Sequence, residues 1–424
     1  MENKRQKLFF LASEIAGKTK KIIPRSVQWK IKNRILKKEI DNYLKKRQKD
    51  FIYKGCLGGI NLIGNIRAEM GLGQSCRLIA NMILKCNCGL SIYNTDTNGN
   101  IKKGDASFDE YISDKLPYQV NIFHVNPLEL GKVFIRIPKA WEKKYNVAFW
   151  LWELEVFPKE WIIYCNLFDE IWTPSQFAAD SIRKATNVPV KVIPYFVVAS
   201  CEESITRKDF KLPGGKFLFL AMFDVNSTLG RKNPLGAVKA FKQAFSAKNQ
   251  NVGLVIKVNN ADEAKLAKLK KELEDYNNVY MITEVMEKKR TNRLIECVDV
   301  FVSLHRAEGF GLVMAEAMML GTPVIATNWS ANVEFMDTGS ACMVDYRLIK
   351  NPKDEDLYKK GCVWAEPDCK QAAIYMKRLA TDTEYYALMQ ENGKRSIKEK
   401  LGEANTIDVL RQEIDRVWKY MNIK

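Results

Sequence analysis

Residues 302–327 read VSLHRAEGFGLVMAEAMMLGTPVIAT and predict a strand, a tight loop, a helix and a second strand in direct succession. Residues 297–304 are mostly apolar and β-branched, which is typical of a buried parallel strand. Gly309 and Gly311 allow a sharp turn, and Gly321 with a proline two residues later ends the helix. Such a unit directs free amides and the positive end of the helix dipole at the glycine loop. The pattern therefore predicts an anion-binding site.

Two carboxylates, Glu308 and Glu316, flank this predicted site. A carboxylate can accept hydrogen bonds from both hydroxyls of a vicinal diol, which sugars offer. The pair predicts a nucleotide sugar, with its phosphates on the loop of Gly309, Phe310 and Gly311, its ribose on one glutamate and its second sugar on the other. The alternative interpretation is that Glu308 only favours the helix dipole and that Glu316 is a solvated helix residue.

The segment HRAEGFGLVMAEAMMLGTPVIAT at residues 305–327 resembles the signature of the retaining glycosyltransferases of family 4, which have two glutamates eight positions apart around a GFG loop. In that family the first glutamate faces the transferred sugar and the second holds the nucleotide ribose. The resemblance implies these roles for Glu308 and Glu316, and it covers roughly residues 55–422. It also implies the GT-B fold, in which two Rossmann-like domains face each other across a cleft.

The length of 424 residues exceeds one ordinary core, and two domains are expected. Alternating strand and helix patterns predict doubly wound α/β domains. We expect a basic amphipathic helical extension at residues 1–53, an acceptor-side Rossmann-like domain at 54–205, a nucleotide-sugar-binding Rossmann-like domain at 206–400 and a C-terminal helix at 401–424. The resemblance implies that this last helix crosses back onto the first domain.

The composition excludes several classes of protein. Ten scattered cysteines and only two histidines argue against a zinc cluster and predict a reduced, cytoplasmic setting. The longest apolar run, FLFLAMF at residues 217–223, is far shorter than the roughly 18 residues that a membrane-spanning helix needs. It predicts a buried strand instead.

The net charge of +17 is concentrated in residues 1–50, which hold sixteen Lys or Arg and five Asp or Glu. Opposite these cations lies a helical stripe of Val27, Ile31, Ile35, Leu36, Ile40, Tyr43 and Leu44. A basic amphipathic helix suits an anionic membrane surface, which predicts a peripheral protein at the cytoplasmic face. A helix packed on the first domain and a nucleic-acid contact are the alternatives, and the prediction is that no nucleic acid is bound.

The first domain contributes three candidate residues before its midpoint. Gly71 and Gly73 precede a predicted helix, but their spacing does not match a dinucleotide fingerprint, which argues against a dehydrogenase. The resemblance implies that this glycine loop faces the donor phosphates and the acceptor. His124 is predicted near the end of a strand, at the edge where open α/β sheets bind ligands. The resemblance implies that it touches the transferred sugar, whereas a structural histidine is the alternative.

Glu153 and His305 are candidates for a contact with the acceptor or the sugar. Glu153 lies in the aromatic run NVAFWLWELEVFP at residues 146–158, where a buried acid needs a partner or a raised pKa. An ion-paired core glutamate is the alternative. His305 ends the strand that precedes the glycine loop.

Three basic residues of the second half are candidates for the donor diphosphate. Arg231 and Lys232 follow a predicted strand and a short loop, and Pro234 stands where the next helix would begin. The resemblance supports this role for the RKN sequence. Lys257 lies inside a predicted strand, where a charge is unusual. Surface or structural lysines are the alternative.

We therefore predict a hexosyltransferase that uses a nucleotide diphosphate sugar and needs neither cofactor nor metal, because two cations and a helix dipole meet the charge of the leaving diphosphate. Retention of stereochemistry is implied by the resemblance. The basic N-terminal segment suggests a glycan or lipid-linked saccharide acceptor in cell-surface polysaccharide assembly. The alternatives are a sugar-nucleotide epimerase or hydrolase of the same fold, and a non-enzymatic basic membrane or nucleic-acid adaptor.

Overall fold

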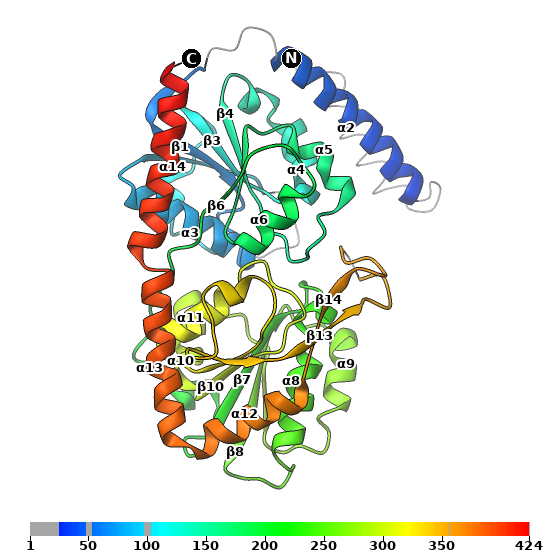
Figure 1. The fold of residues 1–424 in the computed structure, drawn as a ribbon, viewed down its shortest axis with the longest axis vertical. Coiled ribbons are helices and arrows are strands. Elements are labelled where there is room, and N and C mark those ends of the chain that lie inside the picture. Colours follow the sequence, from blue (N-terminus) through cyan, green and yellow to red (C-terminus); the bar gives the residue numbers. More distant parts are fainter. Residues whose placement is uncertain (1–24, 48–52, 97–102, 356, 424) are drawn as a thin grey trace.

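The computed structural model describes residues 25–47, 53–96, 103–355 and 357–423, which form two α/β domains (Figure 1). Each domain is built on a sheet of six parallel strands with helices on its faces. Most strands are buried along nearly their whole length, as parallel sheets covered on both faces require. The predicted doubly wound α/β fold is confirmed.

The first domain has strand order β2-β1-β3-β4-β5-β6. In this order the topological switch point lies between β1 and β3. The last residues of these two strands, Gly64 and His124, are register partners. The strands are β1 (Cys56–Gly64), β2 (Gly89–Asn94), β3 (Tyr118–His124), β4 (Tyr145–Phe149), β5 (Glu170–Thr173) and β6 (Val190–Val192). The helices are α3 (Gly71–Lys85), α4 (Pro127–Arg136), α5 (Ile162–Cys165) and α6 (Gln176–Arg183), with short 3₁₀ turns η1 (Asp109–Tyr111), η2 (Pro138–Trp141) and η3 (Lys159–Trp161).

A buried ladder of asparagines fixes the register of the three central strands in this sheet. Asn61 Nδ2 donates to Asn121 Oδ1, and Asn121 Nδ2 donates to Asn146 Oδ1, each at 2.8 Å. All three side chains are fully buried, so a shifted register would leave amides without partners. The ladder thereby holds the end of β3 beside the end of β1.

The second domain has strand order β12-β11-β10-β7-β8-β9, which places the crossover between β7 and β10. The strands are β7 (Phe217–Asp224), β8 (Val252–Asn259), β9 (Val279–Ile282), β10 (Val300–Ser303), β11 (Val324–Thr327) and β12 (Cys342–Val344). The helices are α7 (Leu229–Lys232), α8 (Pro234–Ala244), α9 (Glu263–Lys271), α10 (Lys288–Cys297), α11 (Leu312–Leu320) and α12 (Cys369–Thr381), with 3₁₀ turns η4 (Arg207–Phe210) and η5 (Ala331–Glu334). The strand-loop-helix-strand unit of residues 302–327 is present as predicted.

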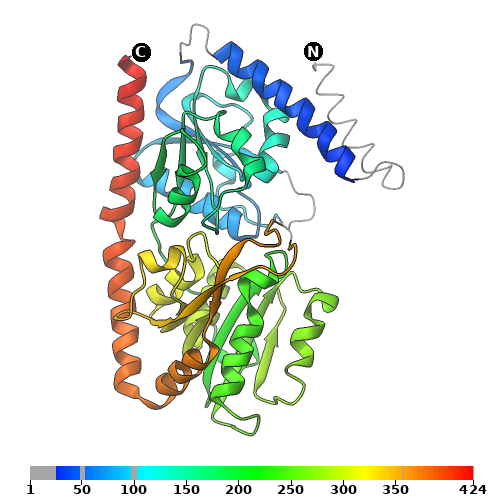
Figure 2. The same cartoon turned by 45° about the vertical axis from the view of Figure 1, so that its right-hand side comes forward.

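Several elements of the second half were not predicted, among them an antiparallel hairpin and the helix that follows α12. The antiparallel strands β13 (Tyr346–Lys350) and β14 (Val363–Pro367) form a hairpin that lies along the junction between the domains (Figure 2). Helix α13 (Thr383–Lys400) follows, and it runs beside the second domain before the chain turns into α14 (Glu403–Ile423).

Helix α14 packs on the first domain, although it follows the second domain in sequence (Figure 1). Its Arg416 pairs with the buried Glu170 of β5 at 2.6 Å, and Glu413 lies 3.3 Å from Lys191. The chain therefore crosses between the domains twice.

The N-terminal helix α2 (Arg25–Arg47) also lies against the first domain, on the side opposite α14 (Figures 1 and 2). Leu36 and Ile40 are buried in the core of that domain, and Tyr43 Oη donates to the Trp141 carbonyl oxygen at 2.9 Å. This part of the predicted apolar stripe therefore faces the protein and not a membrane, as in the alternative interpretation. The side chains of Val27, Ile31 and Ile35 lie outside the described residues.

The basic face of α2 keeps its lysines in solvent. Lys37, Lys38, Lys45 and Lys46 are exposed. None of the helices in the described ranges combines the length and the apolarity that a membrane crossing requires.

Candidate active site

The order of the strands in the second domain brings two segments together at one edge of the sheet. In open α/β sheets, ligands bind outside the carboxyl ends of the strands at the point where the order reverses. Here that point separates β7 from β10. Helix α7 follows β7, and the loop of residues 304–311 follows β10. The predicted diphosphate residues and the predicted sugar-binding loop therefore lie side by side.

Two hydrogen bonds fix α7 against this loop. The amide of Arg306 donates to the carbonyl oxygen of Arg231 at 2.8 Å, and Asn233 Nδ2 donates to the Leu304 carbonyl oxygen at 2.8 Å. Asn233 adopts a left-handed conformation with φ of 49°, and its side chain caps α8 at Gly236. The sequence Arg-Lys-Asn-Pro thus ends one turn, starts the next helix and leaves both cations at the sheet edge.

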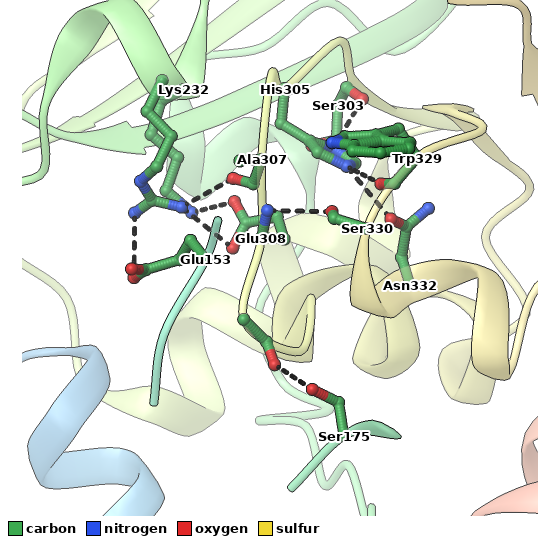
Figure 3. Close-up of polar contacts among 12 residues, drawn as sticks. Glu153, Ser175, Lys232, Ser303, His305, Ala307, Glu308, Trp329, Ser330 and Asn332 are labelled. Atoms are coloured by element: carbon green, nitrogen blue, oxygen red, sulfur yellow. Dashed lines mark hydrogen bonds and ion pairs between the residues drawn. The ribbon is translucent and has the colours of Figure 1, made fainter. Parts of the chain in front are cut away.

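Glu308 lies between these two cations (Figure 3). Its Oε1 pairs with Lys232 Nζ, and its Oε2 lies 3.3 Å from Arg231 Nη1. Arg231 also donates through Nη1 to the Ala307 carbonyl oxygen at 2.9 Å, and its Nη2 lies 3.9 Å from Glu153 Oε1. Three second-domain candidates and one first-domain candidate are therefore in direct contact.

The charged groups of this cluster shift the pKa values of one another. Burial alone would raise the pKa of Glu308, but Lys232 and Arg231 lower it to about 2. Burial lowers the pKa of Lys232, and the pairing with Glu308 offsets part of that effect. For Arg231, burial acts in the same downward direction, but Tyr358, Glu308 and Glu153 outweigh it and raise its pKa. Glu308 is therefore an anion held by two cations at neutral pH.

Tyr358 joins the cluster from the loop between β13 and β14. The Arg231 guanidinium carbon lies 5.9 Å from the centre of the Tyr358 ring, which also stacks on Trp152 with ring centres 5.9 Å apart. Burial raises the pKa of Tyr358 well above its usual value, and a hydrogen bond to Glu153 adds to this. Tyr358 was not predicted as a site residue, because no sequence pattern in its neighbourhood marks the hairpin.

The glycine loop is anchored from behind. The amide of Glu308 donates to Ser330 Oγ at 2.9 Å. His305 is fully buried, with Nε2 lying 3.2 Å from the Trp329 carbonyl oxygen and 3.1 Å from Asn332 Oδ1 (Figure 3). The structure therefore places His305 beneath the loop, where it supports Glu308, and its ring does not reach the surface.

The loop continues into the N-terminus of α11. Gly311 caps this helix with φ of 94°, which favours glycine. Among the described residues, the amides of Leu312 and Val313 donate to no other group, so they are available to an anion. Phe310 is buried, and its ring contacts Tyr195 at 4.9 Å between centres. It anchors the loop from within.

Glu316 lies in α11, farther along the crevice. Its side chain is 2% exposed, and its Oε2 lies 2.5 Å from Lys288 Nζ at the start of α10. Lys288 also lines a cavity of about 280 Å³ between α3, residues 196–200 and α10. The other lining residues include Gln74 of α3, so both domains contribute to this cavity.

Lys257 is buried in β8, at the same edge of the sheet as the Glu308 cluster but without a contact to it. Its Nζ donates to Asn259 Oδ1 at 2.5 Å. Burial lowers its pKa to about 8, and Glu284 and Asp224 oppose the shift.

His124 belongs to a separate, uncharged cluster in the first domain. Its Nε2 lies 2.6 Å from Ser75 Oγ, which also contacts Tyr195 Oη. Burial lowers the pKa of His124 to about 4, so the imidazole is neutral. The chain of contacts continues from Tyr195 to the ring of Phe310 and so reaches the glycine loop of the second domain.

The predicted glycine loop of the first domain differs from the expectation. Helix α3 begins at Gly71, so Gly71 and Gly73 form its first turn instead of preceding it. A Cβ atom on Gly73 would stand 1.9 Å from the Ala68 carbonyl oxygen, whereas one on Gly71 would meet nothing within 4 Å. Gly73 therefore allows the backbone of α3 to pack closely against Ala68, whereas the space beside Gly71 is open.

Direct contacts hold the first domain on the glycine loop. Ser175 Oγ donates to the Gly309 carbonyl oxygen at 2.8 Å. The carboxylate of Glu334 accepts hydrogen bonds from the amides of Gln176 and Phe177 at 2.9 Å each, where the N-terminus of α6 favours negative charge. Neither Ser175 nor Glu334 was predicted as a site residue, because their partners lie more than a hundred positions away.

The sequence of the second domain matches a known family. The family model described as glycosyl transferases group 1 matches residues 205–396. This domain is that of a group 1 glycosyltransferase. No curated protein matches the chain in sequence.

Solved structures share the fold of this glycosyltransferase over nearly its whole length. Alr3699/HepE of Anabaena, in complex with UDP and glucose, has a TM-score of 0.61 at 14% identity, covering 85% of this chain and 99% of that one. Sucrose-phosphate synthase of Thermosynechococcus elongatus has a TM-score of 0.63 at 14% identity, with the same coverage of 85% and 99%. A UDP-forming α,α-trehalose-phosphate synthase of Burkholderia xenovorans has a TM-score of 0.54 at 12% identity, covering 86% and 99%. The two-domain arrangement is therefore the GT-B fold.

Proposed function

We propose that this glycosyltransferase moves a hexosyl group, with retention, from a nucleotide diphosphate sugar to a hydroxyl of a glycan. The observation that carries the proposal is the ionised Glu308 between Arg231 and Lys232 at the crevice of the second domain. The cations suit a diphosphate, and the carboxylate suits sugar hydroxyls. Because the structure of HepE contains UDP and glucose, UDP-glucose is the first donor to test.

Each group has a definite task in the proposed reaction. The bond between the anomeric carbon and the β-phosphate oxygen breaks while the acceptor oxygen bonds to the same carbon, and the acceptor proton passes to the departing phosphate. Arg231, Lys232 and the free amides of α11 stabilise the charge that develops on the diphosphate. Glu308 orients the sugar and stabilises its positive charge.

The second glutamate and the cavity beside it suit the nucleoside. Glu316 is the candidate partner of the ribose diol, and its ion-pair partner Lys288 lines the cavity. His124 is the candidate contact of the transferred sugar in the first domain. Because its imidazole is neutral, it can exchange hydrogen bonds with a hydroxyl without adding charge.

We also propose that the reaction requires no metal ion, because Arg231 and Lys232 take the role of neutralising the diphosphate. Transfer that is unchanged in EDTA and unchanged on addition of Mg²⁺ or Mn²⁺ is expected. Activity that depends on either cation would contradict this part of the proposal.

Product analysis with a panel of UDP and GDP sugars tests the function. Nucleoside diphosphate release that requires a saccharide acceptor, with label recovered on that acceptor, is expected. Free sugar as the main product would indicate a hydrolase, and an isomerised donor would indicate an epimerase. Arg231→Met should abolish release, whereas Arg378→Met on the exposed face of α12 should not.

The basic face of α2 supports a location at an anionic membrane surface, where a lipid-linked acceptor would be found. Each basic residue near such a surface adds about 1 kcal/mol. Replacing Lys37, Lys38, Lys45 and Lys46 by Gln should weaken binding to phosphatidylglycerol vesicles and leave donor turnover in solution unchanged. Deletion of the whole helix is unsuitable because it removes core residues such as Ile40. Vesicle binding that survives the four replacements would refute the location.

A further inference from the structure

We propose that Phe177, Trp329 and Tyr346 form a platform that binds the acceptor glycan beyond the sugar unit that reacts. This inference rests on the proposed transfer to a glycan and adds where that glycan lies. The three rings come from α6, from the loop after β11 and from β13. They form a continuous row, with ring centres 5.8 Å apart between Phe177 and Trp329 and 5.0 Å apart between Trp329 and Tyr346.

The row is not simply part of the core. Phe177 and Trp329 are partly exposed, and Tyr346 is 36% exposed. Leu348 lies two residues along the same strand, on the same face as Tyr346, and is 49% exposed. By contrast, Trp141 is fully buried beneath the stacked ring of Phe123. Aromatic rings left open in a row at the junction of two domains mark a binding surface.

The platform is continuous with the candidate active site. The carbonyl oxygen of Trp329 is a partner of His305, and the next residue, Ser330, accepts the hydrogen bond from the Glu308 amide (Figure 3). The central ring is therefore attached to the loop that holds Glu308. On this proposal, a saccharide whose terminal hydroxyl reacts at Glu308 extends past the edge of this loop onto the row of rings.

The chemistry of the surface suits carbohydrate. Sugar rings have apolar C–H faces and a rim of hydroxyls, so partly exposed aromatic rings cover the faces while polar groups meet the rim. Partial burial raises the pKa of the Tyr346 hydroxyl, and the charge of the exposed Glu155 in the first domain adds to this shift. The platform also spans both domains, since Phe177 belongs to the first and the other two rings belong to the second.

A glycan array probed with the full-length protein tests the inference. The array must carry oligosaccharides of one to eight units, both neutral and acidic. We expect capture of oligosaccharides in preference to their monosaccharides, and Tyr346→Ala should weaken that capture about tenfold. Tyr420→Ala is the matched control, because Tyr420 is 41% exposed and also contacts one ring, that of Tyr145, but lies on α14.

Trp329→Phe and Trp329→Ala distinguish binding from loop support. If the Trp329 ring is part of the platform, capture should be partly lost in Trp329→Phe and fully lost in Trp329→Ala, while the affinity for UDP-glucose in the absence of acceptor stays unchanged in Trp329→Phe. Equal capture by wild type and Tyr346→Ala would overturn the inference, and so would failure of wild type to bind any array member. Capture of a protein instead of a glycan by this surface would overturn it too. If donor turnover itself is missing in wild type, the proposed function fails, which is a separate outcome.

Discussion

The two domains place their crevices at equivalent points of their sheets but fill them with different chemistry. Between β7 and β10, the second domain gathers Arg231 and Lys232 around the ionised Glu308. Between β1 and β3, the first domain gathers Gly64 and His124, and burial keeps the imidazole neutral. The comparison indicates that one crevice is built for charge and the other for uncharged groups.

The difference follows from the cost of burying charge. A buried ion persists only when it is paired and hydrogen-bonded. Glu308 has two cationic partners and stays ionised. Among the described residues, the partners of His124 are the Ser75 hydroxyl and the Phe149 ring, so no anion compensates the charge of its protonated form. A diphosphate is expected to bind in the second domain and a sugar to contact the first.

The largest expected effect comes from removing the charge of Glu308. Glu308→Gln keeps the shape of the side chain but releases Arg231 and Lys232 from their anionic partner. We expect kcat to fall by about 10²–10³, as when one preorganised transition-state contact is lost. The donor should bind as tightly as before or more tightly, because the cations become free for the diphosphate. Steady-state kinetics and donor titration calorimetry measure the two effects.

Glu263→Gln is the control for this experiment, since Glu263 is exposed on α9 and pairs with Lys270. If Glu308→Gln has a normal kcat, the charge of Glu308 does not contribute to catalysis and the proposed role of the charged crevice is wrong. Loss of donor affinity without loss of kcat would show instead that Glu308 serves binding.

The second expected effect is a dependence of stability on pH that originates in the neutral crevice. His124 has a pKa of about 4 in the folded state against an ordinary value of 6.5. Between these values the unfolded chain binds the proton and the folded chain does not. The contribution of the neutral His124 to the free energy of unfolding is therefore fully present above pH 6.5. It is lost as the pH falls toward 4, and it amounts to about 3 kcal/mol in total.

Denaturant unfolding of wild type and His124→Gln between pH 7 and 4 measures this contribution. The variant should be less stable at pH 7 but should lose less stability over the same interval. His305 has its own lowered pKa through burial and remains in both proteins, so some dependence persists. Parallel curves for the two proteins would mean that His124 is not held neutral.

Much of the charged crevice could be predicted from the sequence, because local patterns determine it. Residues 302–327 encode strand, glycine loop and helix within one stretch, and parallel strands present their carboxyl ends at one edge. Arg231 follows β7 and Glu308 follows β10, so their proximity requires only that these strands are neighbours.

The neutral crevice and the hairpin that brings Tyr358 to the candidate active site could not be predicted in this way. Ser75 meets His124 across 49 positions and Tyr195 across 120, from elements with no shared spacing. Tyr358 reaches Arg231 from a hairpin whose strands interrupt the strand and helix alternation. Helix α13 was missed because few of its apolar side chains, among them Met389 and Ile397, are buried. Tertiary packing, and not local pattern, selects these residues.

The smallest expected effect concerns Lys257, which tests how far the charged crevice extends. Its Nζ is bound to Asn259, and among the described residues it has no contact with Glu308 or Arg231. Lys257→Met keeps the volume and removes a buried charge, so the free energy of unfolding should change little or rise. Because the lysine pKa is about 8, wild type should lose donor affinity as the pH rises from 7 to 9, whereas the variant should not.

Donor titration at both pH values measures this difference, with Lys268→Met on the exposed face of α9 as the control. If Lys257→Met binds the donor less than about tenfold more weakly than wild type at pH 7, the difference in binding free energy is less than about 1.4 kcal/mol. Such a difference fits a lysine that acts on the donor from a distance, at the edge of the crevice. A hundredfold loss would mean that Lys257 contacts the diphosphate directly. The charged crevice would then span β8 as well as β7 and β10, and its contrast with the first domain would become larger.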